Sequence, residues 1–150
     1  MKGREICGLP VFSWQEGTLL GHVSQCYLDL KDGVMAGVVL ERPLTKRWYT
    51  VIPSSEILKI YRDGIIVKSS DSVVETNQLG SGKIFCSDFL RRAELRFSEG
   101  EVISDLVFNQ KNAIDGGEIS KGFWNDLSEG RSFLPWSELK RQIRVQKNGR

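Results

Sequence analysis

The most reactive side chains in this sequence are one histidine and three cysteines, and their spacing decides what chemistry they can carry. His22 is the only histidine, and Cys7, Cys26 and Cys86 lie far apart with no C-x-x-C pair. A single histidine cannot build a metal cluster, and cysteines at these spacings match neither a zinc site nor a disulfide framework. We therefore expect His22 to be a strand or surface side chain. The cysteines are expected to be reduced thiols, at least one of them packed as a small apolar group.

The sequence motifs for nucleophilic catalysis and for phosphate binding are also incomplete. Ser24 and Ser104 lack the G-x-S-x-G surroundings of an activated nucleophile. The segment LGSGK ends at Lys83 with no serine or threonine after it, so it does not complete a phosphate-binding loop. Acidic pairs in predicted loops are typical of a solvated surface rather than of an acid–base pair in a cleft. The sequence thus predicts a protein that is not an enzyme, with no catalytic residue, cofactor or metal.

Aromatic side chains offer a binding chemistry instead. Loops that combine tryptophan, tyrosine and arginine are typical of protein-interface hot spots. The candidate interface residues are Trp48, Tyr49, Phe123, Trp124, Arg131 and Trp136. Two interpretations stay open for Phe123 and Trp124: their rings either cover the end of their own domain or face outward to a partner.

The C-terminal end of the chain is basic. Its candidate phosphate contacts are Lys140, Arg141, Arg144, Lys147 and Arg150, against one acid, Glu138, in residues 136–150. This segment is either a solvated terminus or a contact for the phosphates of RNA or anionic lipid. It holds no aromatic residue after position 140, which argues against sequence-specific reading of single strands.

The sequence contains an internal repeat. Residues 23–39 align with residues 103–119 at an offset of 80 without a gap. Further along, residues 52–58 align with residues 134–140 at an offset of 82. The second copy therefore carries two extra residues in the loop between these blocks, since loops tolerate insertions.

The elements that must position these residues are mainly β-strands. The expected strands are Leu20–Leu30, Val34–Leu40, Trp48–Ile52, Ile60–Tyr61 and Ile65–Lys68 in the first copy, and Ala93–Phe97, Val102–Asn109, Ala113–Ser120 and Ser132–Leu134 in the second. Asp-Gly pairs predict hairpin turns at residues 31–33 and 63–64. A serine-capped helical turn is expected at residues 54–58, a polar linker at 69–82, and a helix across the seam between the copies at 136–145.

Short strands joined by glycine-containing turns predict an all-β fold of two tandem small antiparallel barrels. Gly37 and Gly117, matched in the alignment, are expected at sharp bends in the barrel wall. Each copy alone buries a modest core, so we expect the two to pack as a pseudo-twofold pair. The predicted domains are residues 1–77 and residues 83–150, the second including the basic tail and a short C-terminal helix.

The bulk composition is that of a soluble globular protein. The chain has 150 residues, 40% hydrophobic and 27% charged, with a formal net charge of +2. No apolar run approaches the ~20 residues that span a bilayer, and the first residues lack the apolar stretch of a signal peptide. A cytoplasmic location is expected.

The repeated segments carry a family resemblance. GHVSQCYLDLKDGVMAGVVLE with VIPSSEI, and GEVISDLVFNQKNAIDGGEIS in the second copy, resemble the PRC-barrel domain. This is the barrel of the photosynthetic reaction-centre H subunit and of the C-terminal domain of the ribosome maturation factor RimM. Gln25 stands where the second copy has Asp105, and Cys26 replaces an aliphatic residue of the family pattern, so the two copies need not do the same work.

The resemblance implies a non-catalytic docking and assembly module. The function expected first is a cytoplasmic bacterial adaptor that binds another protein through residues 123–136. The alternative is an RNA- or ribosome-associated maturation factor that contacts phosphates through the basic tail. Contact with a membrane surface stays open as a third kind of partner.

Overall fold

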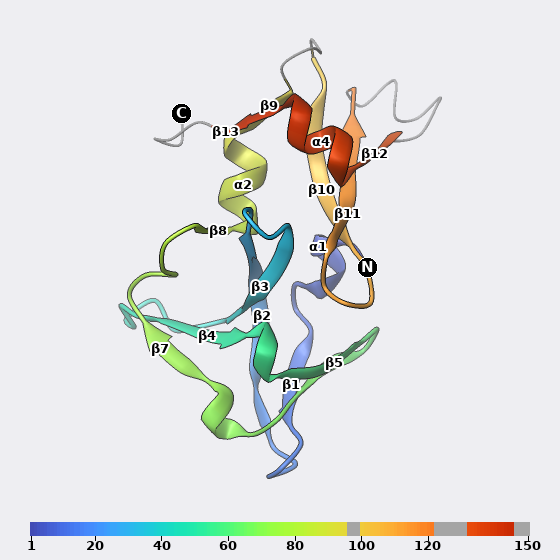
Figure 1. Ribbon diagram of the computed structural model, residues 1–150. Helices are drawn as coiled ribbons and strands as arrows, with labels where there is room; N and C mark the ends of the chain where they lie inside the picture. The colour runs from blue at the N-terminus through green and yellow to red at the C-terminus, as the bar shows by residue number, and fades with distance from the viewer. Residues whose placement is uncertain (96–99, 122–131, 146–150) are drawn as a thin grey trace.

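The protein is built mostly of β-strands (Figure 1). The computed structural model describes residues 1–95, 100–121 and 132–145. The elements of the first half are α1 (Gly3–Ile6), β1 (Pro10–Ser13), β2 (Leu19–Asp29), β3 (Val34–Leu40), β4 (Tyr49–Pro53), η1 (Ser54–Glu56), β5 (Ile57–Tyr61), β6 (Gly64–Val67), η2 (Ser70–Ser72) and β7 (Val74–Thr76). The elements that follow are β8 (Lys83–Phe85), α2 (Cys86–Arg92), β9 (Ala93–Leu95), β10 (Val102–Phe108), β11 (Ile114–Ser120), β12 (Ser132–Pro135), α4 (Trp136–Gln142) and β13 (Ile143–Val145).

The first half forms one large sheet in the order β5-β6-β1-β2-β3-β4-β7, with β8 added beside β2. The pairings are antiparallel except between β1 and β6, which run parallel. The β2–β3 hairpin turns at the predicted residues, with Gly33 at φ +66°, a conformation that glycine adopts without steric cost. In the second half, β10, β11 and β12 form an antiparallel sheet and β9 pairs with β13 as a separate ribbon.

The expected closure of the sheets into barrels is not observed in the described residues. The large sheet ends at β5 and β7, which do not pair with each other, and the β9–β13 ribbon does not pair with the β10–β12 sheet. The turn η1 redirects the chain after β4, so that β5 joins β6 and not β4. Strand β5 is consequently left as an edge.

The register of the two hairpins corrects the sequence alignment. Gly37 lies opposite Pro53, whereas Pro135 lies opposite Gly116 and not opposite Gly117. Tyr27 lies opposite Gly37, whereas the aligned Val107 lies opposite Gly116, so the second strand of the later hairpin is shifted by one position. An added Cβ at either Gly37 or Gly116 would meet the carbonyl oxygen of the residue before the proline. Gly116 is therefore the structural counterpart of Gly37, and the expected match to Gly117 is wrong.

Three local expectations also need correction. The predicted linker contains the helical turn η2 and strand β7, which pairs with β4. Residues 54–56 do form a helical turn, but Pro53 precedes it, and the Ser54 hydroxyl donates to the carbonyl oxygen of Met35 at 2.6 Å instead of capping it. The short helices α1 and α2 carried no capping signal that the sequence analysis recognised.

A reciprocal contact joins the tips of the two hairpins. Val34 and Ala113 form an isolated antiparallel bridge. The Met35 N–H donates to the Asn112 carbonyl at 2.8 Å, and the Ile114 N–H donates to the Gly33 carbonyl at 2.9 Å. Asn112 has φ +64° and so adopts the same left-handed conformation as Gly33.

A second exchange adds a segment of each half to the hairpin of the other. Strand β8, which precedes α2, pairs with β2, and Tyr27 lies opposite Phe85. Lys2, which precedes α1, bridges to Val107 on β10. The two short helices thus occupy corresponding places at the junction, where both contact β2 and β10.

One buried cluster spans both halves. It includes Val23, Leu28 and Met35 from the first hairpin and Leu106 and Ile114 from the second. The helix α4 contributes the fully buried Leu139 and packs on β11. The indole Nε1 of Trp136 lies 2.7 Å from where a Cβ of Gly33 would stand, so α4 reaches the β2–β3 turn. The helix expected at 136–145 ends at Gln142, and Ile143–Val145 form β13.

The register correction predicts unequal costs for neighbouring alanine substitutions. Gly116→Ala should destabilise the protein by about 1–3 kcal/mol, because the new methyl group would meet the Leu134 backbone. Gly117→Ala is the matched control and should cost less, since its nearest neighbours, at 3.2 Å, are the ends of the Ile103 and Leu139 side chains. Urea unfolding of both variants measures the difference, and an equal or reversed order would contradict the corrected register.

Candidate protein-binding site

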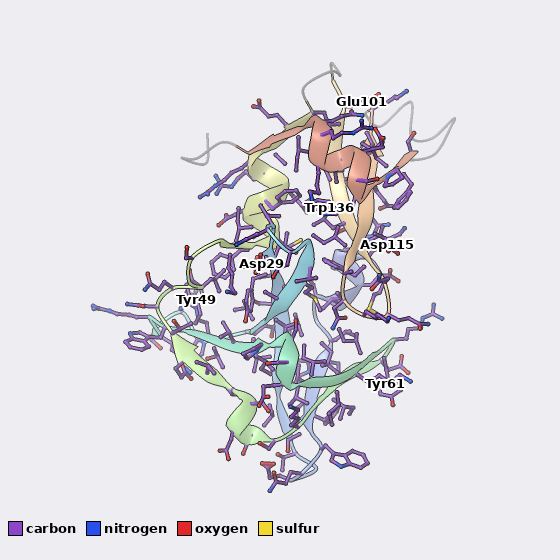
Figure 2. All side chains as sticks on the ribbon, viewed as in Figure 1. Asp29, Tyr49, Tyr61, Glu101, Asp115 and Trp136 are labelled. Atoms are coloured by element: carbon purple, nitrogen blue, oxygen red, sulfur yellow. The ribbon has the colours of Figure 1, made fainter. Side chains whose placement is uncertain are left out.

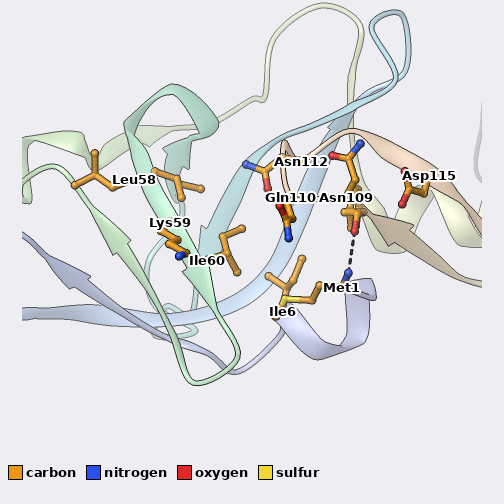
Figure 3. Close-up of a pocket in the computed structure, with 11 residues that line it drawn as sticks. Met1, Ile6, Leu58, Lys59, Ile60, Asn109, Gln110, Asn112 and Asp115 are labelled. Carbon is orange, nitrogen blue, oxygen red and sulfur yellow. Dashed lines mark hydrogen bonds between the residues drawn. The ribbon is translucent and has the colours of Figure 1, made fainter.

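A pocket lies between the edge strand β5 and the turn of the second hairpin (Figure 3). Its volume is about 700 Å³. Figure 3 shows the β5 residues on one side and the β10–β11 turn on the other, with Met1 and Ile6 between them. The lining residues are Met1, Ile6, Ile57, Leu58, Lys59, Ile60, Phe108, Asn109, Gln110, Asn112 and Asp115.

The first wall of this pocket presents unpaired backbone groups. Within the described residues β5 pairs with β6 alone. Tyr61 and Gly64 are the pair beside the two-residue turn, and the pair at that position exchanges the hydrogen bonds of the hairpin. Ile60, the next residue, therefore points its N–H and C=O away from β6 toward the free edge. Such an edge is a template for another extended chain.

The opposite wall is a rigid polar turn. The Asn109 side-chain oxygen accepts hydrogen bonds from the N–H groups of Lys111 at 2.8 Å and Ala113 at 3.0 Å. Asn112 is held by its carbonyl bond to Met35. Gln110 is exposed, and its amide lines the pocket. This wall can offer side-chain donors and acceptors without changing its backbone.

The floor of the pocket is apolar and its rim carries both signs of charge. Ile6 and Phe108 are buried, with 1% and 3% of their surfaces exposed. Lys59 and Asp115 are exposed lining residues, one cationic and one anionic. An apolar floor between two hydrogen-bonding walls suits a polypeptide, which combines apolar side chains with a polar backbone.

A second, smaller cleft of about 400 Å³ lies where the two hairpins and the two short helices meet. On one side Asp105, only 3% exposed, accepts from the Arg4 N–H at 3.1 Å. On the other side Gln25, which aligns with Asp105, accepts from the Ser87 hydroxyl at 2.6 Å. All three cysteines line this cleft.

The predicted reactive residues behave as expected from their types. His22 is an exposed strand residue, and Cys26 and Cys86 are buried free thiols, whereas Cys7 is exposed. Hydrogen bonding to Cys86, together with burial, raises the pKa of the Cys26 thiol, and burial raises the pKa of Cys7. In the described part of the chain no group of three or more His, Cys, Asp or Glu residues is arranged to hold a metal ion.

Among the predicted interface residues that the structure describes, Tyr49 and Trp136 lie apart (Figure 2). Tyr49 is half-buried, with its ring 4.9 Å from that of Phe85 and the Arg42 guanidinium 4.1 Å from its centre. Trp48 is 51% exposed. Trp136 lies on another side of the molecule from Tyr49 and packs against Phe89 and the Gly33 turn (Figure 2). Phe123, Trp124 and Arg131 lie outside the described residues.

The basic segment is described only in part. Lys140 and Arg141 are exposed on α4, and Arg141 forms an ion pair with Glu138 one turn earlier. Arg144 belongs to β13, where its backbone lies opposite Glu94. Lys147 and Arg150 lie outside the described residues.

The pocket beside β5 was missed by the sequence analysis. Its walls are separated by about fifty residues of sequence, and no local motif marks either as a binding residue. The only available signal was the hydrophobic Ile57–Ile60 stretch, which reads as an ordinary strand. Sequence reasoning likewise gave no role to the exposed apolar residues Phe12, Trp14 and Leu19 on β1 and around the β1–β2 turn.

The fold defines a small, mainly antiparallel β-module with a pocket beside an open edge. Residues 1–74 match the model of the PRC-barrel domain family. Through this region the chain belongs to the PRC-barrel family, as the hairpin and turn motifs indicated. A comparison with curated proteins finds no match. None of the helices among the described residues has the length and apolar character needed to cross a membrane.

The position of Trp136 predicts a structural role for this ring. Trp136→Ala should destabilise the protein by about 2–3 kcal/mol, somewhat below the cost for a fully buried large aromatic residue. Trp14→Ala is the matched control: its ring is 74% exposed, and its loss should cost less than about 0.5 kcal/mol. Thermal melting of both variants tests this, and a Trp136→Ala variant as stable as the Trp14→Ala variant would return Trp136 to the candidate interface.

Proposed function

We propose that this protein is a non-catalytic adaptor that binds an extended segment of another protein beside strand β5. The carrying observation is the unpaired edge of β5 along a pocket whose floor is apolar and whose far wall is a rigid polar turn. Strand addition of this kind derives affinity from backbone hydrogen bonds and specificity from alternate side chains that enter the pocket. The four lining residues of β5 suit a short segment of similar length.

We further propose that the second half is a second unit of the same type, related to the first by an approximate twofold axis. Support for this proposal comes from the β-bulges at matching places in the two hairpins, the paired Gly33 and Asn112 turns and the exchanged segments before α1 and α2. In this arrangement residues 1–77 form the first unit and residues 83–150 the second. The pocket then needs both units, because β5 comes from one and the 109–112 turn from the other.

A protein partner fits the pocket better than a nucleic acid does. Among the described side chains that line it, Lys59 is the cation and Asp115 the anion, and the Met1 ammonium is already bound to the Phe108 carbonyl. Nucleic-acid sites gather several cations against the phosphates. The basic tail remains the basis of the alternative, an RNA- or ribosome-associated factor, and the exposed Lys140 and Arg141 are its described part. The proposed docking role of residues 123–136 also stays a prediction for most of that segment.

Peptide selection on the full-length protein tests the β5 proposal. Peptides of about twelve residues are selected from a display library, and their affinities are measured for the wild type, Ile60→Pro and Ile60→Val. Proline removes the outward N–H at an edge position where it is tolerated, whereas valine keeps that N–H. We expect a loss of affinity of about tenfold or more for Ile60→Pro and little change for Ile60→Val, in line with a net loss of about one hydrogen bond.

Two further measurements make the outcome decisive. Hydrogen exchange on the wild type should show the Ile60 amide protected when peptide is bound, which does not depend on the stability of any variant. Raising the salt from 50 to 200 mM should leave peptide affinity nearly unchanged, whereas phosphate contacts through the tail would weaken RNA binding steeply. Failure to select peptides that protect Ile60, together with salt-sensitive RNA binding lost in Lys140→Ala/Arg141→Ala, would favour the RNA-associated alternative.

A further inference from the structure

We propose that Cys26 and Cys86 form an oxidative modification site, in which a low-molecular-weight disulfide converts the two thiols into a disulfide that ties the two halves together. Cys26 lies on β2 of the first half and Cys86 begins α2 after the linker. This site is separate from the pocket beside β5, because neither cysteine lines that pocket.

The strand register brings the two cysteines to the same end of one ladder. In the antiparallel pairing of β2 with β8, Asp29 lies opposite Lys83, Leu28 opposite Ile84 and Tyr27 opposite Phe85. The pairing ends there, and the next residue on each segment is a cysteine: Cys26 on β2, and Cys86 as the first residue of α2. Directly opposed residues of an antiparallel pair have Cα atoms about 4.5–5.5 Å apart, within the range of about 4.4–6.8 Å that disulfides require.

Side-chain contacts agree with this placement. The interaction with Cys86 is the main cause that raises the pKa of the Cys26 thiol. The space beside Cys86 is kept open by Gly3, where an added Cβ would stand 3.7 Å from the Cys86 sulfur. On the other side of the junction the bridge joins Lys2 to Val107, and the residues that follow it, Gly3 and Leu106, carry no thiol.

The cleft at the junction gives a small reagent a route to the pair. Cys26 is 1% exposed and Cys86 is 6% exposed, and both line the cleft of about 400 Å³. The exposed Cys7 lines the same cleft. It follows α1 and is not a strand residue, so no strand pairing places it opposite Cys26 or Cys86. The pair is therefore accessible in place, without unfolding of β2.

The reaction is a balanced thiol–disulfide exchange. Cys86, the more exposed of the two, attacks the small disulfide as its thiolate, forms a mixed disulfide and releases one small thiol. The Cys26 sulfur then attacks the Cys86 sulfur, the protein disulfide forms, and the second small thiol leaves. The protein loses two electrons and two protons, and the reagent gains them. The interaction with Cys86 and burial, which raise the Cys26 pKa, keep its thiolate fraction low and make the second step slow.

The experiment exposes the folded full-length protein to bis(2-hydroxyethyl) disulfide and then counts free thiols by alkylation and mass spectrometry after denaturation. The matched variant Cys7→Ser leaves Cys26 and Cys86 as its only cysteines. We expect Cys7→Ser to lose both thiols, to give a cross-linked peptide containing Cys26 and Cys86, and to remain monomeric by non-reducing electrophoresis if the reduced protein is monomeric. Its melting temperature should rise on oxidation and fall back on reduction, because the bond closes a long loop of the unfolded chain.

Cys86→Ser and Cys26→Ser are the companion variants and should form no internal disulfide. The proposal is overturned if Cys7→Ser keeps two free thiols, if it stops at the mixed disulfide, or if the wild-type cross-link contains Cys7. It is also overturned if the cross-link forms only in denaturant, since the folded register then does not hold the sulfurs together. Instability of either companion variant does not affect these outcomes, which are measured on Cys7→Ser and on the wild type.

Discussion

The antiparallel bridge between Val34 and Ala113 is the contact on which the arrangement of the two halves depends. Its two hydrogen bonds, from Met35 to Asn112 and from Ile114 to Gly33, satisfy backbone groups of both hairpin tips at once. Each bond needs the residue before the bridge in a left-handed conformation, and glycine and asparagine adopt that conformation more readily than other residues. Buried side chains from both hairpins then pack into one core around this bridge.

The same bridge explains why the binding pocket exists at all. It holds the 109–112 turn near β5, although these segments belong to different halves. Had the first sheet closed on itself, the β5 edge would have been satisfied within one unit and would have had nothing to offer a partner. The open edge is thus the feature on which the proposed binding of an extended chain rests.

The chemistry of the junction differs from one half to the other although the backbones correspond. Around Glu118 the second half uses ion pairs, at 2.9 Å to Lys2 and 3.1 Å to Arg4. At the corresponding place the first half has the buried Val39 with Phe85 packed nearby. Charged pairs partly exposed to water contribute modestly, whereas apolar burial does not depend on salt. The stability of the two junction faces should therefore depend differently on ionic strength. The thiol pair, which only one side of the junction carries, is a further difference.

The sequence by itself determined the β-rich class, the hairpin of Leu20–Leu30 and Val34–Leu40, the internal repeat and the PRC-barrel family, because strand periodicity, Asp-Gly turns and short motifs are local signals. It also placed Trp136 in a helix. Tertiary structure alone decided that Gly116 corresponds to Gly37, that the sheets stay open, and that Cys26 and Cys86 line one cleft. Strand register, edge pairing and the exchange of segments between halves depend on contacts between residues far apart in the chain. Such contacts do not change the local hydrophobic pattern of either strand, so the sequence pattern cannot predict them.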